Sequence, residues 1–176
     1  MFFSLAAAMM MGGDGDDDSS GTDTTPKTPV VPTLPSGQYV KLVQTSLTDV
    51  INLAELEVFA KAGTTNLAAG KTVTSSAFHP VGPGSYLVDG VITGYNFAHT
   101  MNEVADTEDS MLIDLGSVQE IEKIKITNRT DCCTERAIGI KVVILGADGT
   151  TVIKETAAIT TDAATYTFTF PGTAWV

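Results

Sequence analysis

Short stretches of alternating apolar and polar residues follow one another from residue 37 to the end of the chain. The runs are QYVKLVQ, LAELEVFAK, MLIDLG, IEKIKITN, IKVVILG, TVIKETA and TYTFTF, all rich in Val, Ile, Thr or Phe. A period of two residues indicates strands with one buried face, and turns such as Asp89-Gly90 and Asp148-Gly149 separate them. No segment keeps a helical period. This pattern predicts an all-β fold, an antiparallel β-sandwich of the jelly-roll type.

The two ends of this strand-rich region are unusual. The final run TFTFPGTAWV continues the strand pattern without a polar exit, and a sandwich without its last strand would expose an edge and part of its core. The run GQYVKLVQTSLTDVINLAELEVF supplies two strands at the other end. We therefore expect these N-terminal strands to replace the usual C-terminal ones, in the same chain or in a neighbouring copy.

The first 36 residues differ from the rest. Residues 1–11 contain an apolar run of the length of a signal-peptide core, too short to span a bilayer and not preceded by basic residues. Residues 12–36 are rich in Gly, Asp, Ser, Thr and Pro and predict a disordered acidic linker. We expect one folded domain over residues 37–176, secreted or tethered at the cell surface (periplasmic or extracellular).

The net charge of −11 changes the range of expected partners. Nucleic acids and anionic membrane surfaces would repel such a chain. We therefore expect no nucleic-acid partner and no membrane insertion.

The most distinctive run is NRTDCCTER, which holds both cysteines of the chain, Cys132 and Cys133, between Arg129 and Arg136. Free buried cysteines among surface ion pairs are one interpretation. A vicinal disulfide is another, since it would lock the local backbone and present a compact sulfur surface beside two guanidinium groups. Such a surface suits a sugar, which combines hydroxyl acceptors with an apolar C–H face.

Metal-dependent and nucleophilic chemistry fit this run less well. Adjacent cysteines point to opposite faces of a strand, and His79 and His99 lack the spacing of zinc ligands. A vicinal cysteine pair in an exported protein would oxidise, and no spacing indicates the two carboxylates of a glycoside hydrolase. The sequence predicts a protein that is not an enzyme.

The run NRTDCCTER resembles the signature of the F-type lectins (fucolectins), Arg-x-Asp-Cys-Cys-x-Glu-Arg, at every signature position. The runs NLAAGKTVTSSA, YLVDG, AHT and LIDLGSVQEIEKIKITNR agree in family order, so the resemblance covers residues 66–146. It implies the galactose-binding-like jelly roll of the discoidin (coagulation factor C-type) superfamily. It also implies a lectin that binds glycans containing L-fucose.

The resemblance implies a sugar site built from three polar residues, His99, Arg129 and Arg136, which would hydrogen-bond the fucose. It further implies that Cys132 and Cys133 form a disulfide that packs on the sugar ring.

Further positions follow from the same resemblance. Asp131 and Glu135 would orient the guanidinium groups without touching the sugar. Aromatic loop residues would hold the fucose methyl group, and the candidates are Phe97, Tyr95, Phe78 and His79.

The family also implies a structural calcium ion, held by an aspartate of the Asp-Gly turn, a glutamate of the closing strand and loop carbonyls. Asp89 matches the aspartate. LAELEVF matches the closing strand, which makes Glu55, with the Ala54 carbonyl, the candidate there, and oxygen ligands suit calcium. The remaining candidate positions are Tyr86, Val91 and Asn96. A turn aspartate and a surface acid without metal remain the alternative.

In family terms the strand order would be circularly permuted, or the chain would be a piece of a tandem array. A homo-oligomer or a tandem neighbour would raise avidity for fucosylated glycans. The alternative function is a discoidin-like adhesion module, or a carbohydrate-binding accessory module, for another glycan such as a galactoside or for a protein.

Overall fold

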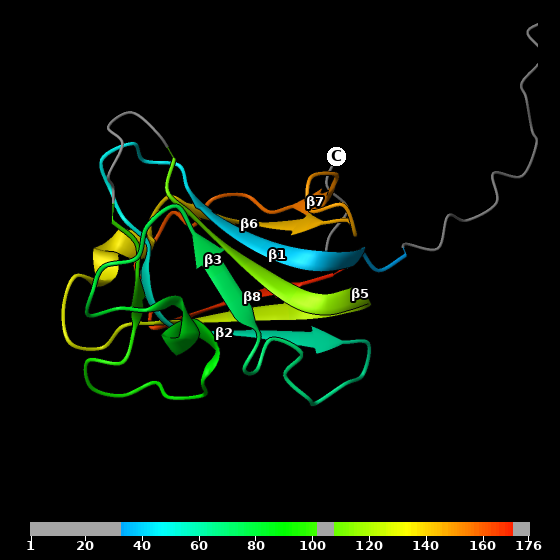
Figure 1. Ribbon diagram of the computed structural model, residues 1–176, viewed down its shortest axis with the longest axis horizontal. Helices are drawn as coiled ribbons and strands as arrows, with labels where there is room; N and C mark the ends of the chain where they lie inside the picture. Colours follow the sequence, from blue (N-terminus) through cyan, green and yellow to red (C-terminus); the bar gives the residue numbers. More distant parts are fainter. Residues whose placement is uncertain (1–32, 102–107, 171–176) are drawn as a thin grey trace, which may run out of the picture. The chain divides into compact units, whose positions relative to one another are not determined.

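The computed structural model describes residues 33–101 and 108–170 of the 176-residue chain. Within these ranges the chain forms strands and two short 3₁₀ turns (Figure 1). The strands are β1 Ser36–Gln44, β2 Asn52–Ala60, β3 Thr72–Ser75, β4 Ala98–His99, β5 Ser110–Asn128, β6 Ile140–Leu145, β7 Val152–Glu155 and β8 Thr165–Thr169, and the turns are η1 Gly84–Val88 and η2 Thr134–Ala137. In the described ranges, no helix has the length and apolar character needed to cross a bilayer. The all-β prediction is confirmed.

Some predictions concern residues outside the described ranges. These are the signal-like segment 1–11, most of the linker predicted at 12–36, and the final run beyond residue 170. The linker ends earlier than predicted, because the Leu34 side chain packs against the core. The Pro35 carbonyl also accepts a hydrogen bond of 2.9 Å from the Ile121 amide, and β1 begins at Ser36.

Two antiparallel sheets share the 19-residue strand β5. The first sheet has the order β3-β5-β1-β6-β7, and the second has the order β4-β2-β5-β8. Pairing with β1 is interrupted between Asp114 and Gln119, where Gly116 adopts a φ of +86°, a conformation that costs glycine little. The runs MLIDLG and IEKIKITN, which the pattern separates, are therefore one strand. The arrangement is the predicted jelly-roll sandwich.

The N-terminal strands are interior strands of this sandwich. β1 lies between β5 and β6 (Figure 1), and β2 pairs with β4 on one side and β5 on the other. Both pair within the same chain, so the sandwich does not need a second copy to supply them.

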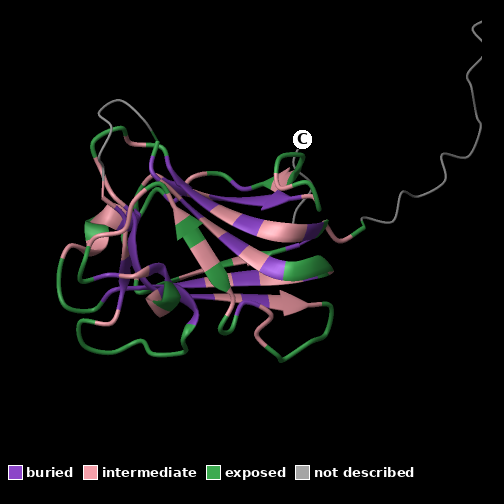
Figure 2. Ribbon diagram, viewed as in Figure 1, coloured by how far each residue is buried: buried purple, intermediate pink, exposed green. Residues whose placement is uncertain are grey.

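The core lies between the two sheets and follows the alternation seen in the sequence (Figure 2). In β5, for example, Ile113, Ile121, Ile124 and Ile126 are fully buried, whereas the polar residues between them are more exposed. Burying such side chains contributes about 1.5–3 kcal/mol each. The period-two pattern is therefore the main determinant of this fold.

Strand β2 breaks the alternation at Ala54. Leu53 pairs with Asn128 of β5 and Glu55 pairs with the next residue, Thr127, so one residue of β2 has no opposite partner. Such a bulge reverses which face the following side chains occupy. Leu53 and Leu56 therefore both lie in the core, and Glu55 points away from it while remaining only 2% exposed.

Candidate functional site

Arg129 follows directly after the last residue of β5, and it is held on three sides. Its Nε and Nη2 donate to Oδ1 and Oδ2 of Asp131 at 2.7 and 2.6 Å. The guanidinium carbon lies 3.8 Å from the ring centroid of Phe97. A bidentate ion pair combined with an aromatic face fixes the plane of a guanidinium group. The hydrogen bonds from Arg129 lower the pKa of Asp131 to about 2.

Asn52, the first residue of β2, connects Arg129 to Arg136 of η2. With its amide oxygen oriented toward the two arginines, it accepts from Nη1 of Arg129 at 3.1 Å and from Nη1 of Arg136 at 3.0 Å. Asn52 is fully buried. The two arginines, which are the only ones in the chain, are thus joined through a single oxygen.

His99 lies opposite Asn52 in the register between β2 and β4. Its Nδ1 lies 2.5 Å from the Thr100 carbonyl oxygen, so Nδ1 carries the proton and donates, and Nε2 is left as an acceptor. Burial lowers the pKa of His99, and the positive charges of Arg136 and Arg129 lower it further. The ring is therefore neutral at neutral pH. We call Asn52, Phe97, His99, Arg129, Asp131 and Arg136 the arginine cluster.

Asn128 ties the loop that carries the arginines to the rest of the sandwich. Its Nδ2 donates to the carbonyls of Thr134 and Ala163 at 2.9 and 3.1 Å. Its Oδ1 accepts from the Arg129 amide at 2.9 Å. Neither Asn128 nor Asn52 was predicted from the sequence. The available signal was that each asparagine adjoins an apolar strand run.

Gly82 packs directly against the backbone of β4. Its carbonyl accepts from the His99 amide at 2.9 Å, and a Cβ at this position would lie 2.5 Å from the His99 Cβ and 2.9 Å from the His99 nitrogen. We expect Gly82→Ala to displace β4 and to lower the free energy of unfolding by about 1–3 kcal/mol, measured by denaturant titration. Gly146→Ala is the control, because its nearest neighbour would be 3.6 Å away. Equal stability of the two variants would contradict this packing argument.

Cys132 and Cys133 form a vicinal disulfide, and neither is a free thiol. Cys133 has a φ of 58°, in the left-handed region. Cys132 is exposed and Cys133 is partly exposed, so the disulfide lies at the surface. In the sequence, the pair stands between the two arginines. Of the two interpretations of the cysteines, the structure has the disulfide.

The remaining sugar-site candidates lie in different environments. Phe97 is only 6% exposed and lies against Arg129, which leaves little of its ring for a ligand. Tyr95 is 81% exposed, and the His79 ring lies 5.0 Å from that of His99. Phe78 packs partly against the core. Glu135 is exposed and makes no ion pair among the described residues.

The residues proposed for calcium gather around the Asp-Gly turn. Oε2 of Glu55 accepts from the Gly90 amide at 2.9 Å, and Oδ1 of Asp89 accepts from the Val91 amide at 2.9 Å. The Asn96 amide group donates to both Asp89 oxygens at 3.1 and 3.0 Å and to the Val91 carbonyl at 3.0 Å. Ala54 forms the bulge next to Glu55, whereas Tyr86 in η1 makes no described contact with these groups.

Within this group, the feature that favours a cation is the Glu55 carboxylate. Its Oε1 is buried without a hydrogen-bond partner in the described part of the chain, a costly arrangement for a carboxylate. Burial raises its pKa to about 7, and the negative charge of Asp89 contributes to the increase. No described group joins three or more His, Cys, Asp and Glu side chains. Carbonyl oxygens would therefore complete the ligand set, as is common for calcium.

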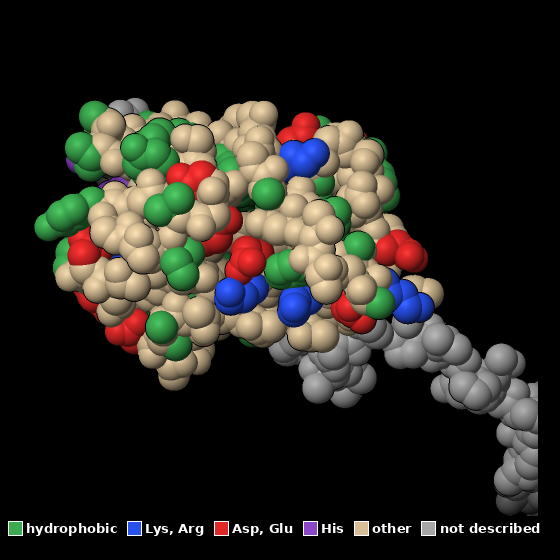
Figure 3. Space-filling view, turned by 90° about the horizontal axis from the view of Figure 1, so that it is seen from below, with side chains coloured by type: hydrophobic (Ala, Val, Ile, Leu, Met, Phe, Trp, Pro, Cys, Tyr) green, Lys and Arg blue, Asp and Glu red, His purple; other side chains and the backbone are tan. Residues whose placement is uncertain are grey.

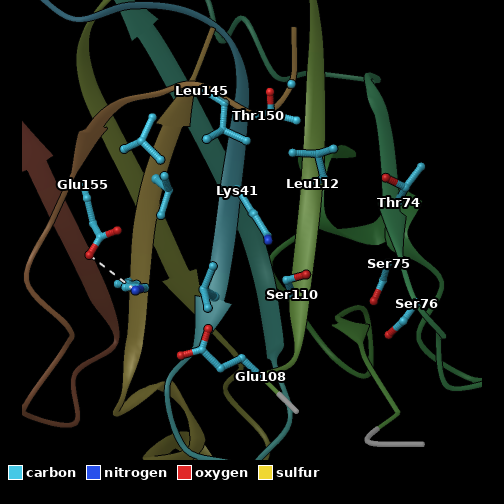
Figure 4. A pocket seen from close by; sticks show the side chains of 15 residues that line it. Lys41, Thr74, Ser75, Ser76, Glu108, Ser110, Leu112, Leu145, Thr150 and Glu155 are labelled. Carbon is cyan, nitrogen blue, oxygen red and sulfur yellow. Dashed lines mark hydrogen bonds and ion pairs between the residues drawn. The ribbon is translucent and has the colours of Figure 1, made fainter. Parts of the chain in front are cut away.

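Acidic and basic side chains are interspersed on the face shown in Figure 3. A cavity of about 580 Å³ lies on the outer face of the first sheet, over Lys41, Leu112 and Lys141 (Figure 4). It contains no member of the arginine cluster. The arginine cluster is the candidate functional site, because a buried arginine held by several partners is a stronger indication of function than an open surface hollow.

Residues 86–175, just over half of the chain, match the family model described as the NedA-like, galactose-binding domain, an F5/F8 type C domain. The chain belongs to this family. The matched residues of this galactose-binding-like domain include His99, the disulfide and both arginines, whereas β1 and β2 precede them. No curated protein and no solved structure matched the chain. Membership indicates carbohydrate binding in general, and such domains are typically binding modules without catalytic activity.

Proposed function

We propose that this galactose-binding-like domain is a lectin for L-fucose-containing glycans, and that the sugar binds at the arginine cluster beside the vicinal disulfide. The observation that carries the proposal is the junction of both arginines through Asn52, opposite a neutral His99. Guanidinium N–H groups donate to ring and hydroxyl oxygens, and the histidine Nε2 accepts from a hydroxyl. The cluster thus offers both kinds of hydrogen bond that a sugar needs.

The other parts of the site have supporting roles in this proposal. The disulfide would pack on the apolar face of the sugar, and the exposed Tyr95 ring is available for the fucose methyl group. Glu55, Asp89 and neighbouring carbonyls would hold a structural calcium ion, which neutralises the buried carboxylate and fixes the turn. Export and display on the N-terminal segment would allow several copies to act together.

The expected affinity for a single site is modest. Three or four hydrogen bonds contribute about 1 kcal/mol net each, and ring packing adds to them. This corresponds to a dissociation constant on the order of 10–100 μM. Glycan binding by the exported protein would then depend on multivalent presentation.

The proposal is tested by calorimetric titration of the purified chain with L-fucose and, separately, with D-galactose. We expect saturable binding of fucose in the stated range and at least about tenfold weaker binding of galactose. The second candidate is a galactoside-binding module, which the description of the family favours. Preference for galactose would support that candidate and overturn the fucose assignment.

A further inference from the structure

Among the described residues, Asn52 is the one whose side chain hydrogen-bonds to both arginines. It is fully buried at the start of β2, far in the sequence from the NRTDCCTER run. Its amide oxygen accepts hydrogen bonds from Nη1 of Arg129 at 3.1 Å and from Nη1 of Arg136 at 3.0 Å. Two guanidinium groups that share an acceptor are close neighbours and repel each other. The shared oxygen offsets this repulsion and fixes their separation.

The two arginines depend on this oxygen to different degrees. Arg129 is also held by Asp131 and by the Phe97 ring. The Arg136 guanidinium has Asn52 as its one hydrogen-bond partner among the described residues. Loss of the Asn52 oxygen would therefore release Arg136 and leave Arg129 in place.

The same contacts divide the donors of the pair. A guanidinium group carries five N–H groups. Arg129 directs its Nε, Nη1 and Nη2 at protein acceptors, whereas Arg136 uses only Nη1 among the described residues. Arg136 is thus the arginine with more N–H groups for a ligand, and Arg129 is the better anchored of the two.

We propose that Asn52 is a positioning residue that holds Arg136 against the anchored Arg129, so that the two guanidinium groups form one donor surface. Its neutral amide fixes the geometry without cancelling the positive charge, which a carboxylate would do. The charged or titratable groups of the arginine cluster are Arg129, Arg136, Asp131 and His99, and His79 lies next to His99. This positioning role rests on the proposed function in one respect only, that the ligand of the donor surface is a sugar.

The first test uses side-chain ¹⁵N NMR of the two arginines in the sugar-free protein. We expect slow rotation about the Nε–Cζ bond of both guanidinium groups in the wild type. Asn52→Leu, which keeps the side-chain volume but has no acceptor, should speed the rotation of Arg136 about tenfold or more, the effect of a lost charge-assisted hydrogen bond. Arg129 should be unchanged and serves as the internal control. Unchanged Arg136 rotation, or an equal change in both arginines, would overturn the proposal.

The second test separates the acceptor from the fold. Asn52→Asp restores an acceptor, so the slow rotation of Arg136 should return even though the carboxylate cancels part of the positive charge. The affinity of Asn52→Leu should fall about tenfold. The new carboxylate should also raise the pKa of His99, followed by NMR. If Asn52→Leu does not fold, Asn52→Ala takes its place.

The two proposals fail in different ways. Fast rotation of the Arg136 guanidinium group in wild type would contradict the positioning role of Asn52, whichever sugar binds. The same holds if Asn52→Leu leaves this rotation unchanged. Absence of fucose binding by the wild type would contradict the proposed function, and the NMR evidence for the positioning role would be unaffected.

Discussion

Arg136→Ala should eliminate retention of the domain on immobilised fucose while leaving its fold nearly as stable as wild type. The Arg136 guanidinium is partly exposed, and Asn52 is its one hydrogen-bond partner in the described ranges. Hydrogen bonds from a charged donor contribute about 1.5–3 kcal/mol, so the affinity should fall about 10- to 150-fold. From a starting value on the order of 10–100 μM, the dissociation constant would move to about 0.1–15 mM.

Arg129→Ala should lose sugar binding to a similar extent and should also destabilise the fold. The Arg129 side chain is 7% exposed and packs on Phe97, so its removal leaves a gap. It also leaves the Asp131 carboxylate without its partner. We expect a loss of about 1–3 kcal/mol in the free energy of unfolding, measured by denaturant titration alongside the retention assay.

The matched control for both variants is Lys141→Ala. Lys141 of β6 forms a 3.4 Å ion pair with Glu155 of β7, the neighbouring strand of the first sheet, and a surface pair of this kind contributes about 0–1 kcal/mol. This variant removes one positive charge without touching the arginine cluster, so its retention should equal that of wild type. Wild-type retention by either arginine variant would show that the sugar binds elsewhere.

The strand pattern predicted the fold because the sandwich buries one face of nearly every strand. The pattern also indicated that the two N-terminal strands complete the sandwich, which their pairing with β5 bears out. It did not show that two runs join into the continuous β5. The junction depends on Gly116, whose positive φ lets the strand pass from one sheet to the other, and a glycine between two runs suggests a turn equally well.

The site was predicted only as far as its residues lie in one motif. The NRTDCCTER run indicated Arg129 and Arg136, and it left the state of the cysteines open. Asn52 could not be found in this way, because its contact with the arginines depends on the pairing of β2 with β5 and on the buried start of β2. Phe97 illustrates the same limit. Its aromatic character suggested a ligand contact, but its partner is Arg129, which only the folded chain brings to it.

Glu55 makes the stability of the calcium-free protein depend on pH in a direction opposite to that of most carboxylates. Burial raises its folded pKa from 4.5 to about 7, so the folded state keeps a proton that the unfolded state has lost. The stabilisation is therefore present at low pH and is lost as the pH rises through this interval. With calcium removed by a chelator, we expect the free energy of unfolding to fall by about 2–3 kcal/mol across it.

If calcium occupies the proposed site at Glu55 and Asp89, it should reverse this trend, because it would bind only the ionised carboxylates and its affinity would rise as they lose their protons. A free calcium concentration one hundred times its dissociation constant would stabilise the folded state by about 2.7 kcal/mol. The midpoint temperatures of thermal unfolding measured with chelator and with calcium should therefore coincide at low pH and separate above pH 7. Glu55→Gln should remove both the calcium effect and its share of the pH dependence. Glu57→Gln, two residues along and paired with Lys125 at 2.7 Å, should preserve the calcium effect. A calcium response that persists in Glu55→Gln would exclude Glu55 as a ligand.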